Sequence, residues 1–199
     1  MKEELVEVMN YYSLEEHTHR FAVWAAARAS QRGFTTTSKI QSAIEAVNLR
    51  EKLVNFESSS QSFDELHKEI CTGLMSYFET HLQSRNTKIN EKDDKDLFAS
   101  FDQKGTYGKC AKIIAIYIKV AYVIPNSKCQ LAKIAHPPID RILLTALQKS
   151  GGCKFNKINW TNFSKDDYFL TIQEIRKIQK GVDFWKIEVL WNPAKTDQE

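Results

Sequence analysis

Apolar residues recur at the three- and four-residue spacing of an α-helix along most of the chain. In the first half this spacing predicts three helices, which begin near residues 14, 37 and 63. Each follows residues that commonly cap a helix: Ser13 before the first, a run of Thr and Ser at 35–38 before the second, and a Ser-rich linker at 58–62 before the third. Gly33 is expected to end the first helix.

The second half is predicted to be helical as well. Residues 85–96 are polar and charged without an apolar period, which predicts an exposed loop between two possible lobes, 1–84 and 97–199. Helices are expected from about residue 107, after Pro137-Pro138, and near 167–180 and 183–191. Only the segment YIKVAYV, at 117–123, would also suit a strand. The sequence therefore predicts an all-α protein that folds as one compact unit over residues 1–199.

Composition narrows the class of protein. A chain of 199 residues with 42% hydrophobic content can form one domain with a substantial core. The four cysteines include no C-x-x-C pair and the N-terminus lacks a secretion signal, so a reduced, intracellular protein of cytoplasm or nucleus is expected. The longest apolar stretch, 113–124, is too short to span a bilayer. We expect a monomer with no membrane partner, and no metal site is predicted.

The segment KGTYGKCAKIIAIYIK, at 104–119, places a lysine where a helix disfavours it. Lys109 falls in the first turn of the predicted helix, at the positive end of the helix dipole. A phosphate-binding P-loop is excluded, because the glycine spacing is too short and Cys110 replaces the Ser or Thr that would bind magnesium. One interpretation is a solvated surface lysine. The other is a free amine that acts as a nucleophile, beside backbone N–H groups that bind a phosphate.

Two segments resemble consecutive motifs of the helix-hairpin-helix superfamily of DNA glycosylases. GTYGKCAKIIAI, at 105–116, is similar to the pattern G-h-G-x-K-x-A, where h is apolar, and AHPPIDRILLTAL, at 135–147, is similar to h-P-h-D-x-x-h. Asp140 follows Lys109 after a longer interval than in most of the superfamily, which is similar to the archaeal type of 8-oxoguanine DNA glycosylase. Tyr107 stands where the second hairpin glycine is expected, so the hairpin is degenerate.

The resemblance implies a two-lobed helical DNA glycosylase with abasic-site (AP) lyase activity, acting on double-stranded DNA that contains a modified, 8-oxoguanine-like base. Lys109 would form a Schiff base with the sugar, and Asp140 would stabilise the cationic sugar. The DNA contacts it implies are Gly105, Tyr107, Gly108, Lys112, His136 and Arg141. The candidates for a base pocket are Trp24, Ile113, Trp185, Glu188 and Trp191, although burial in the core is the commoner role for tryptophans such as Trp24. No metal or organic cofactor is implied.

Several alternatives stay open at the level of sequence. Lys119 is a second candidate nucleophile, because it lies on the same predicted helix and is flanked by apolar residues. The second half is basic, which suits binding of DNA phosphates as well as an ordinary solvated surface; its lysines include residues 104, 112, 119, 128, 133, 149, 154 and 157. A non-enzymatic helical module that binds nucleic acid or a protein partner is the main alternative to an enzyme. A defence protein acting on modified phage bases is a third.

Overall fold

The computed structural model describes residues 11–30, 34–56, 58–82 and 104–193, together with Val6 and Met9. These residues contain helices and connections but no strand, which confirms the all-α class. The predicted loop at 85–96 lies outside the described residues, as does Gly33. The elements in chain order are α2 (Leu14–Ala29), α3 (Thr37–Ala46), α4 (Leu49–Phe56), α5 (Phe63–Leu82), α6 (Tyr107–Ile118), η2 (Lys119–Val123), α7 (Gln130–Ile134), α8 (Arg141–Lys149), η3 (Trp160–Asn162), α9 (Lys165–Gln179) and η4 (Phe184–Leu190).

Side-chain caps begin the helices largely where the sequence predicts them. Ser13 accepts a hydrogen bond from the backbone N–H of Glu16 at the start of α2, and Thr36 caps α3 in the same way. The sequence pattern did not predict α4 as a separate helix after α3. Asn48 divides them with a positive φ of 50°, a left-handed conformation that Asn tolerates better than most residues.

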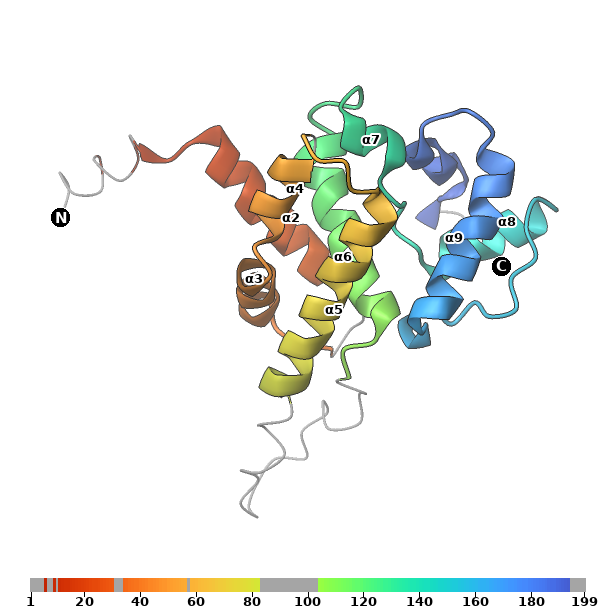
Figure 1. Cartoon of the computed structure of the whole chain (residues 1–199), viewed down its shortest axis with the longest axis horizontal. Coiled ribbons are helices and arrows are strands. Elements are labelled where there is room, and N and C mark those ends of the chain that lie inside the picture. The colour runs from red at the N-terminus through yellow and green to blue at the C-terminus, as the bar shows by residue number, and fades with distance from the viewer. Residues whose placement is uncertain are drawn as a thin grey trace, which may run out of the picture.

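Helix α6 forms the centre of the molecule (Figure 1), packed against α2 and α5 on one side and against η3 and α9 on the other. Eleven of its 12 residues are buried, so other parts of the protein cover this helix on nearly all sides. One hydrophobic cluster includes residues from α2 to η4. The helices that precede and follow the undescribed stretch therefore share a core through α6.

A π-helix, η2, continues α6 at Lys119. The segment that suited either a helix or a strand in the sequence thus forms a helix with a widened turn. Its defining hydrogen bond runs from the N–H of Ile124 to the carbonyl oxygen of Lys119 at 2.9 Å, a separation of five residues. Such π turns are rare and frequently occur at functional sites. None of the helices in the described part of the chain is long and apolar enough to cross a bilayer.

Trp24 is not a core residue, contrary to the prediction for the alanine-rich helix. Its side chain is 46% exposed and stacks on the exposed ring of Phe21, with ring centroids 5.5 Å apart. The reason lies in the register of α2, which buries the small residues Ala22, Val23 and Ala26. Those small side chains allow close packing against α6 and direct the indole of Trp24 to the opposite face.

Candidate functional site

Two ion pairs and two tryptophans gather along one face of α6 and η2. We call these six residues the Lys112 cluster, and its members are Lys112, Lys119, Asp140, Trp160, Glu188 and Trp191. The central contact joins Lys112 Nζ to Asp140 Oδ2 at 2.9 Å. Lys112 and Lys119 are two helical turns apart, which brings them to the same face.

Asp140 is held in place by its role as the N-cap of α8. Its Oδ1 accepts a hydrogen bond from the backbone N–H of Leu143 at 2.9 Å, while its backbone is extended with φ −148°. Pro138 precedes it, and the Pro138 carbonyl oxygen lies 3.4 Å from Lys112 Nζ. One carboxylate oxygen thus anchors the helix, and the other is directed at the amine of Lys112.

Lys112 is buried to an extent that is unusual for a lysine. Its side chain is 5% exposed and that of Asp140 is 15% exposed. Burial lowers the pKa of the Lys112 amine below its ordinary value, and the charge and hydrogen bond of Asp140 oppose this shift without reversing it. A lysine in this environment carries a larger fraction of free amine near neutral pH than a surface lysine does. Only the free amine is a nucleophile.

Two tryptophans border the ion pair. The indole N–H of Trp191 donates to Asp140 Oδ2 at 2.9 Å, so this oxygen accepts from both Lys112 and Trp191. Lys112 Nζ also lies 5.7 Å from the ring centroid of Trp160. Trp191 is 38% exposed, which places the cluster at the surface and not deep in the core.

The second ion pair joins Lys119 to Glu188. Lys119 Nζ also lies 5.5 Å from the centroid of Trp191, which connects the two pairs through one ring. The charge of Glu188 raises the pKa of Lys112, and the charge of Lys119 lowers it. Glu188, which the sequence suggests as a pocket acid, therefore influences the buried amine through its charge, although its direct partner is Lys119.

Lys109 occupies a different environment. Its side chain is fully buried, and Nζ donates to the carbonyl oxygen of Lys104 at 2.9 Å and lies 4.9 Å from the centroid of Phe34. Both contacts stabilise an ammonium group. The lysine that contacts Asp140 is Lys112, one helical turn further along α6, and not Lys109.

The hairpin-like residues before Lys109 are packed inside the protein. A Cβ on Gly108 would lie 1.9 Å from the carbonyl oxygen of Trp160, and one on Gly105 would lie 2.8 Å from Cβ of Phe78. Tyr107 is buried and its hydroxyl lies 3.1 Å from Nδ1 of His67. The glycines therefore allow α6 to approach η3 and α5 closely. Close approach of a DNA phosphate, the reason the sequence suggested, is blocked at Tyr107 and Gly108 in this conformation.

His136 belongs to a second polar network, which runs from the buried His136 and Tyr168 to the partly exposed Asp64 and Arg176. Its Nε2 lies 2.9 Å from Asp64 Oδ1, and Asp64 also accepts two hydrogen bonds from Arg176. Its Nδ1 lies 3.1 Å from the hydroxyl of Tyr168. The pKa of His136 is lowered by burial, with the Asp64 carboxylate opposing the shift. His136 thus joins α5 to α9, and its hydrogen bonds go to these residues and not to Asp140.

The other predicted site residues are dispersed. Ile113 is fully buried in the core, and Trp185 is partly buried in η4, where its indole N–H has no hydrogen-bond partner among the described residues. Arg141 is exposed at the start of α8, one position after Asp140. Among the described residues, no three His, Cys, Asp or Glu side chains are grouped so that they could bind a metal ion.

Sequence reasoning missed two features of the cluster. Lys112 was assigned to phosphate contact, although its position two turns before Lys119 would have placed both on one face. Trp160 gave no signal, because its place beside Lys112 depends on the packing of η3 against α6.

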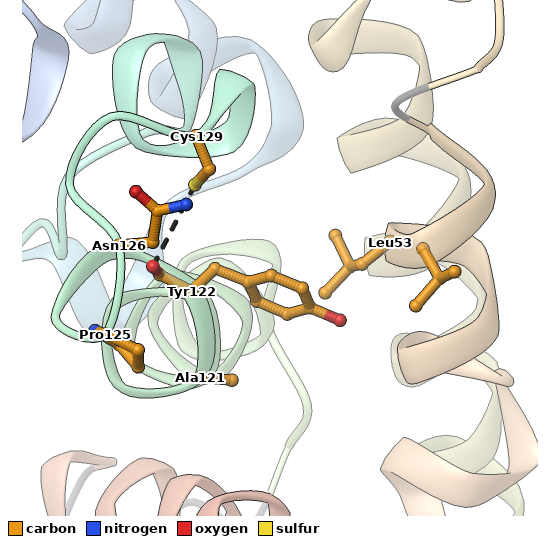
Figure 2. Close-up of a pocket in the computed structure, with 7 residues that line it drawn as sticks. Leu53, Ala121, Tyr122, Pro125, Asn126 and Cys129 are labelled. Carbon is orange, nitrogen blue, oxygen red and sulfur yellow. Dashed lines mark hydrogen bonds between the residues drawn. The ribbon is translucent and has the colours of Figure 1, made fainter. Parts of the chain in front are cut away.

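A shallow hollow lies between α4 and the segment that includes η2 and its connection to α7 (Figure 2). It is lined by Leu53, Val54, Ala121, Tyr122, Pro125, Asn126 and Cys129. Its volume of about 240 Å³ is below the roughly 300–1,000 Å³ of typical ligand pockets. No member of the Lys112 cluster lines it.

The function proposed below rests on the geometry of the Lys112 cluster. Comparisons of the chain with protein-family models, with curated protein sequences and with solved structures found no match.

Proposed function

We propose that this protein is a DNA glycosylase with AP-lyase activity, and that Lys112 is its nucleophile. The observation that carries the proposal is the buried Lys112–Asp140 pair, with the indole of Trp191 on the same carboxylate oxygen. Burial lowers the pKa of the Lys112 amine, which favours a nucleophilic free amine, and the carboxylate beside it could stabilise positive charge on a sugar. Lys109 of the family-like motif is replaced in this role by the lysine that contacts the aspartate.

The chemistry assigns a separate task to each group. The free amine of Lys112 would attack C1′ of the deoxyribose while the bond between C1′ and the base breaks, and the departing base would take that electron pair and then a proton. The carboxylate of Asp140 would stabilise the positive charge that develops on the sugar. Loss of a proton and opening of the sugar ring would give a Schiff base on Lys112. Removal of a C2′ proton would then expel the 3′ phosphate and break the strand.

Features around the cluster are consistent with a DNA substrate. A base must leave the stack to be excised, and aromatic rings commonly receive it; Trp160 and Trp191 border the amine. Exposed basic residues that could contact phosphates include Arg141, Lys128, Lys133, Lys154 and Lys157. Affinity for duplex DNA should therefore fall steeply as salt rises.

Borohydride trapping tests this proposal. The wild-type protein is incubated with duplexes that contain an abasic site or 8-oxoguanine, and a Schiff base is reduced to a stable cross-link. Lys112→Gln should lose the cross-link, whereas the folded Lys109→Gln variant should retain it. Lys133→Gln, at an exposed lysine on α7, is the control for loss of positive charge. Wild-type trapping by Lys112→Gln would contradict the assignment.

The second candidate function is a non-enzymatic helical module. Two observations favour it. No residue of the Lys112 cluster lines the hollow in Figure 2. The polar groups of the cluster already form hydrogen bonds with one another. In that case the Lys112–Asp140 pair would join α6 to α8 as a structural contact. DNA binding without any cross-link, on every lesion in a panel, would favour this function.

A further inference from the structure

The contacts between the two ion pairs form a continuous chain. Lys112 contacts Asp140, Asp140 accepts from the indole of Trp191, and the Trp191 ring lies over Lys119. Lys119 in turn pairs with Glu188. Trp191 thus has two attachments, one polar contact to the carboxylate and one cation–π contact to Lys119.

We propose that Lys119 and Glu188 are positioning residues, which hold Trp191 over Asp140 and so control access to the amine of Lys112. This inference rests on the proposed lysine chemistry at the same site. In the described part of the chain, the hydrogen bonds of the Lys112 amine go to Pro138 and Asp140, and neither Lys119 nor Glu188 needs to touch the sugar. They act through the indole of Trp191, which is released when either member of the pair loses its charge.

Partial burial strengthens the ion pair between Lys119 and Glu188. The Glu188 side chain is 14% exposed and that of Lys119 is 31% exposed, so their contact is screened less than a surface ion pair. Because the Glu188 carboxylate balances its charge, the Lys119 ammonium can remain beneath the Trp191 ring without being an uncompensated buried charge. Without Glu188, the Lys119 side chain would lose its ion pair, and its contact with the Trp191 ring would be less firmly held.

The backbone at Lys119 supports a specific role for this side chain. The π-helix begins at Lys119, and the widened turn departs from the regular hydrogen bonding of α6 at this residue. Single π turns inside α-helices are frequently found at functional sites. Here the π turn coincides with the lysine that contacts both η4 and Trp191.

The position of the Trp191 ring matters for how a substrate approaches the Lys112 amine. The Trp191 indole and the Lys112 amine share Asp140 Oδ2, so in this proposal a sugar that approaches the amine also meets the ring. With the ion pair intact the ring returns to one position. Without it the ring samples others, and Asp140 loses a fixed hydrogen-bond donor.

Tryptophan fluorescence tests the positioning without DNA. The contribution of Trp191 is obtained by subtracting the spectrum of the corresponding Trp191→Phe protein, and its quenching by acrylamide is measured. Lys119→Met and Glu188→Gln should both raise the quenching constant of Trp191. Lys119→Arg, which keeps the charge and the cation–π contact, should restore the wild-type value. Lys186→Met is a matched control, because Lys186 contacts the Trp185 ring and Asp183 on the same element.

A second readout uses the pH profile of trapping on abasic DNA. Glu188→Gln leaves the cation of Lys119 unneutralised near Lys112, which should shift the profile to lower pH. Lys119→Met leaves Glu188 instead and should shift it to higher pH. The two variants should move the profile in opposite directions because the two charges act on the Lys112 amine with opposite sign, so the quenching data decide whether the pair positions Trp191.

The outcomes separate this inference from the proposed function. If wild-type protein forms no cross-link, the lysine chemistry fails, while the quenching data still decide whether the pair positions Trp191. If Trp191 is quenched equally in wild type, Lys119→Met and Glu188→Gln, the positioning role is overturned. A rise in quenching in Lys186→Met as large as in Lys119→Met would also overturn it, because the effect would then not depend on the Asp140 contact.

Discussion

Lys112 and Asp140 are 28 residues apart in the sequence, yet their charged groups meet at 2.9 Å. The intervening chain includes the π-helix η2 and the short helix α7, which return it from the end of α6 to the start of α8. Because Asp140 also caps α8, its carboxylate is fixed by the backbone as well as by the lysine. A preorganised carboxylate can stabilise positive charge without first reorienting.

Asp140→Asn separates the charge of this residue from its cap. Asn is as good an N-cap as Asp, so α8 should still form, although the melting temperature should fall because the buried Lys112 loses its charged partner. Base excision under single-turnover conditions should fall by at least ~10²-fold, as expected for loss of a positioned catalytic group. Asp167→Asn, at a carboxylate that also pairs with a lysine near a helix start, is the control. Equal activity in Asp140→Asn and Asp167→Asn would contradict the catalytic role.

The pH dependence of trapping follows from the lowered pKa of Lys112. Burial disfavours the ammonium form, so the free amine predominates at a lower pH than for a lysine in water. The trapping rate should therefore rise with pH and level off below the ~10.4 of an unperturbed lysine. A rate on abasic DNA that still rises tenfold per pH unit up to that value would indicate an exposed lysine as the nucleophile.

Gly108→Ala tests whether the hairpin-like glycine is required for packing. The added Cβ would collide with the Trp160 carbonyl oxygen and force η3 away from α6. The free energy of unfolding should fall by about 1–3 kcal/mol, as for other overpacked sites. Gly152→Ala has its nearest contact at 3.4 Å and should stay within about 0.5 kcal/mol of wild type in chemical denaturation. A stable Gly108→Ala protein that binds DNA poorly would support a backbone contact instead.

Sequence patterns gave the class and most helix starts, since caps such as Ser13 and Thr36 act within a few residues. Local patterns could not place Trp24, because its exposure depends on which stripe of α2 meets α6. They likewise directed attention to Lys109, whose position beside a glycine has the family-like form. The identity of the lysine that meets Asp140 depends on long-range packing of α6, η3 and α8.

Asp64→Asn tests the network of Asp64, His136 and Arg176 through acid stability. Hydrogen bonds from Arg176 and His136 hold the pKa of Asp64 well below its usual range. The stabilisation is therefore fully present above the ~3.9 of unfolded aspartate and is lost as pH falls below that value. At pH 7 the variant should be less stable than wild type by about 1–3 kcal/mol, the range for hydrogen bonds to charged groups.

The loss of stability at acid pH provides the control for the Asp64→Asn variant. Burial lowers the pKa of His67 and His136, so both proteins should also lose stability as pH falls below the ~6.5 of an unfolded histidine. The difference between wild type and Asp64→Asn should shrink only at lower pH, where the carboxylate becomes protonated. A constant difference from pH 7 to pH 3, measured by urea unfolding, would show that the charge of Asp64 is not the source of the stabilisation.

The most direct test of the central claim is to identify the amine that the sugar modifies. Wild-type protein is cross-linked to an abasic duplex with borohydride, digested with nuclease and protease, and the peptide that carries the sugar remnant is sequenced by mass spectrometry. The remnant should be found on Lys112, the amine held against Asp140. A remnant on Lys109 or Lys119, or no cross-linked peptide at all, would contradict the assignment of Lys112 as the nucleophile.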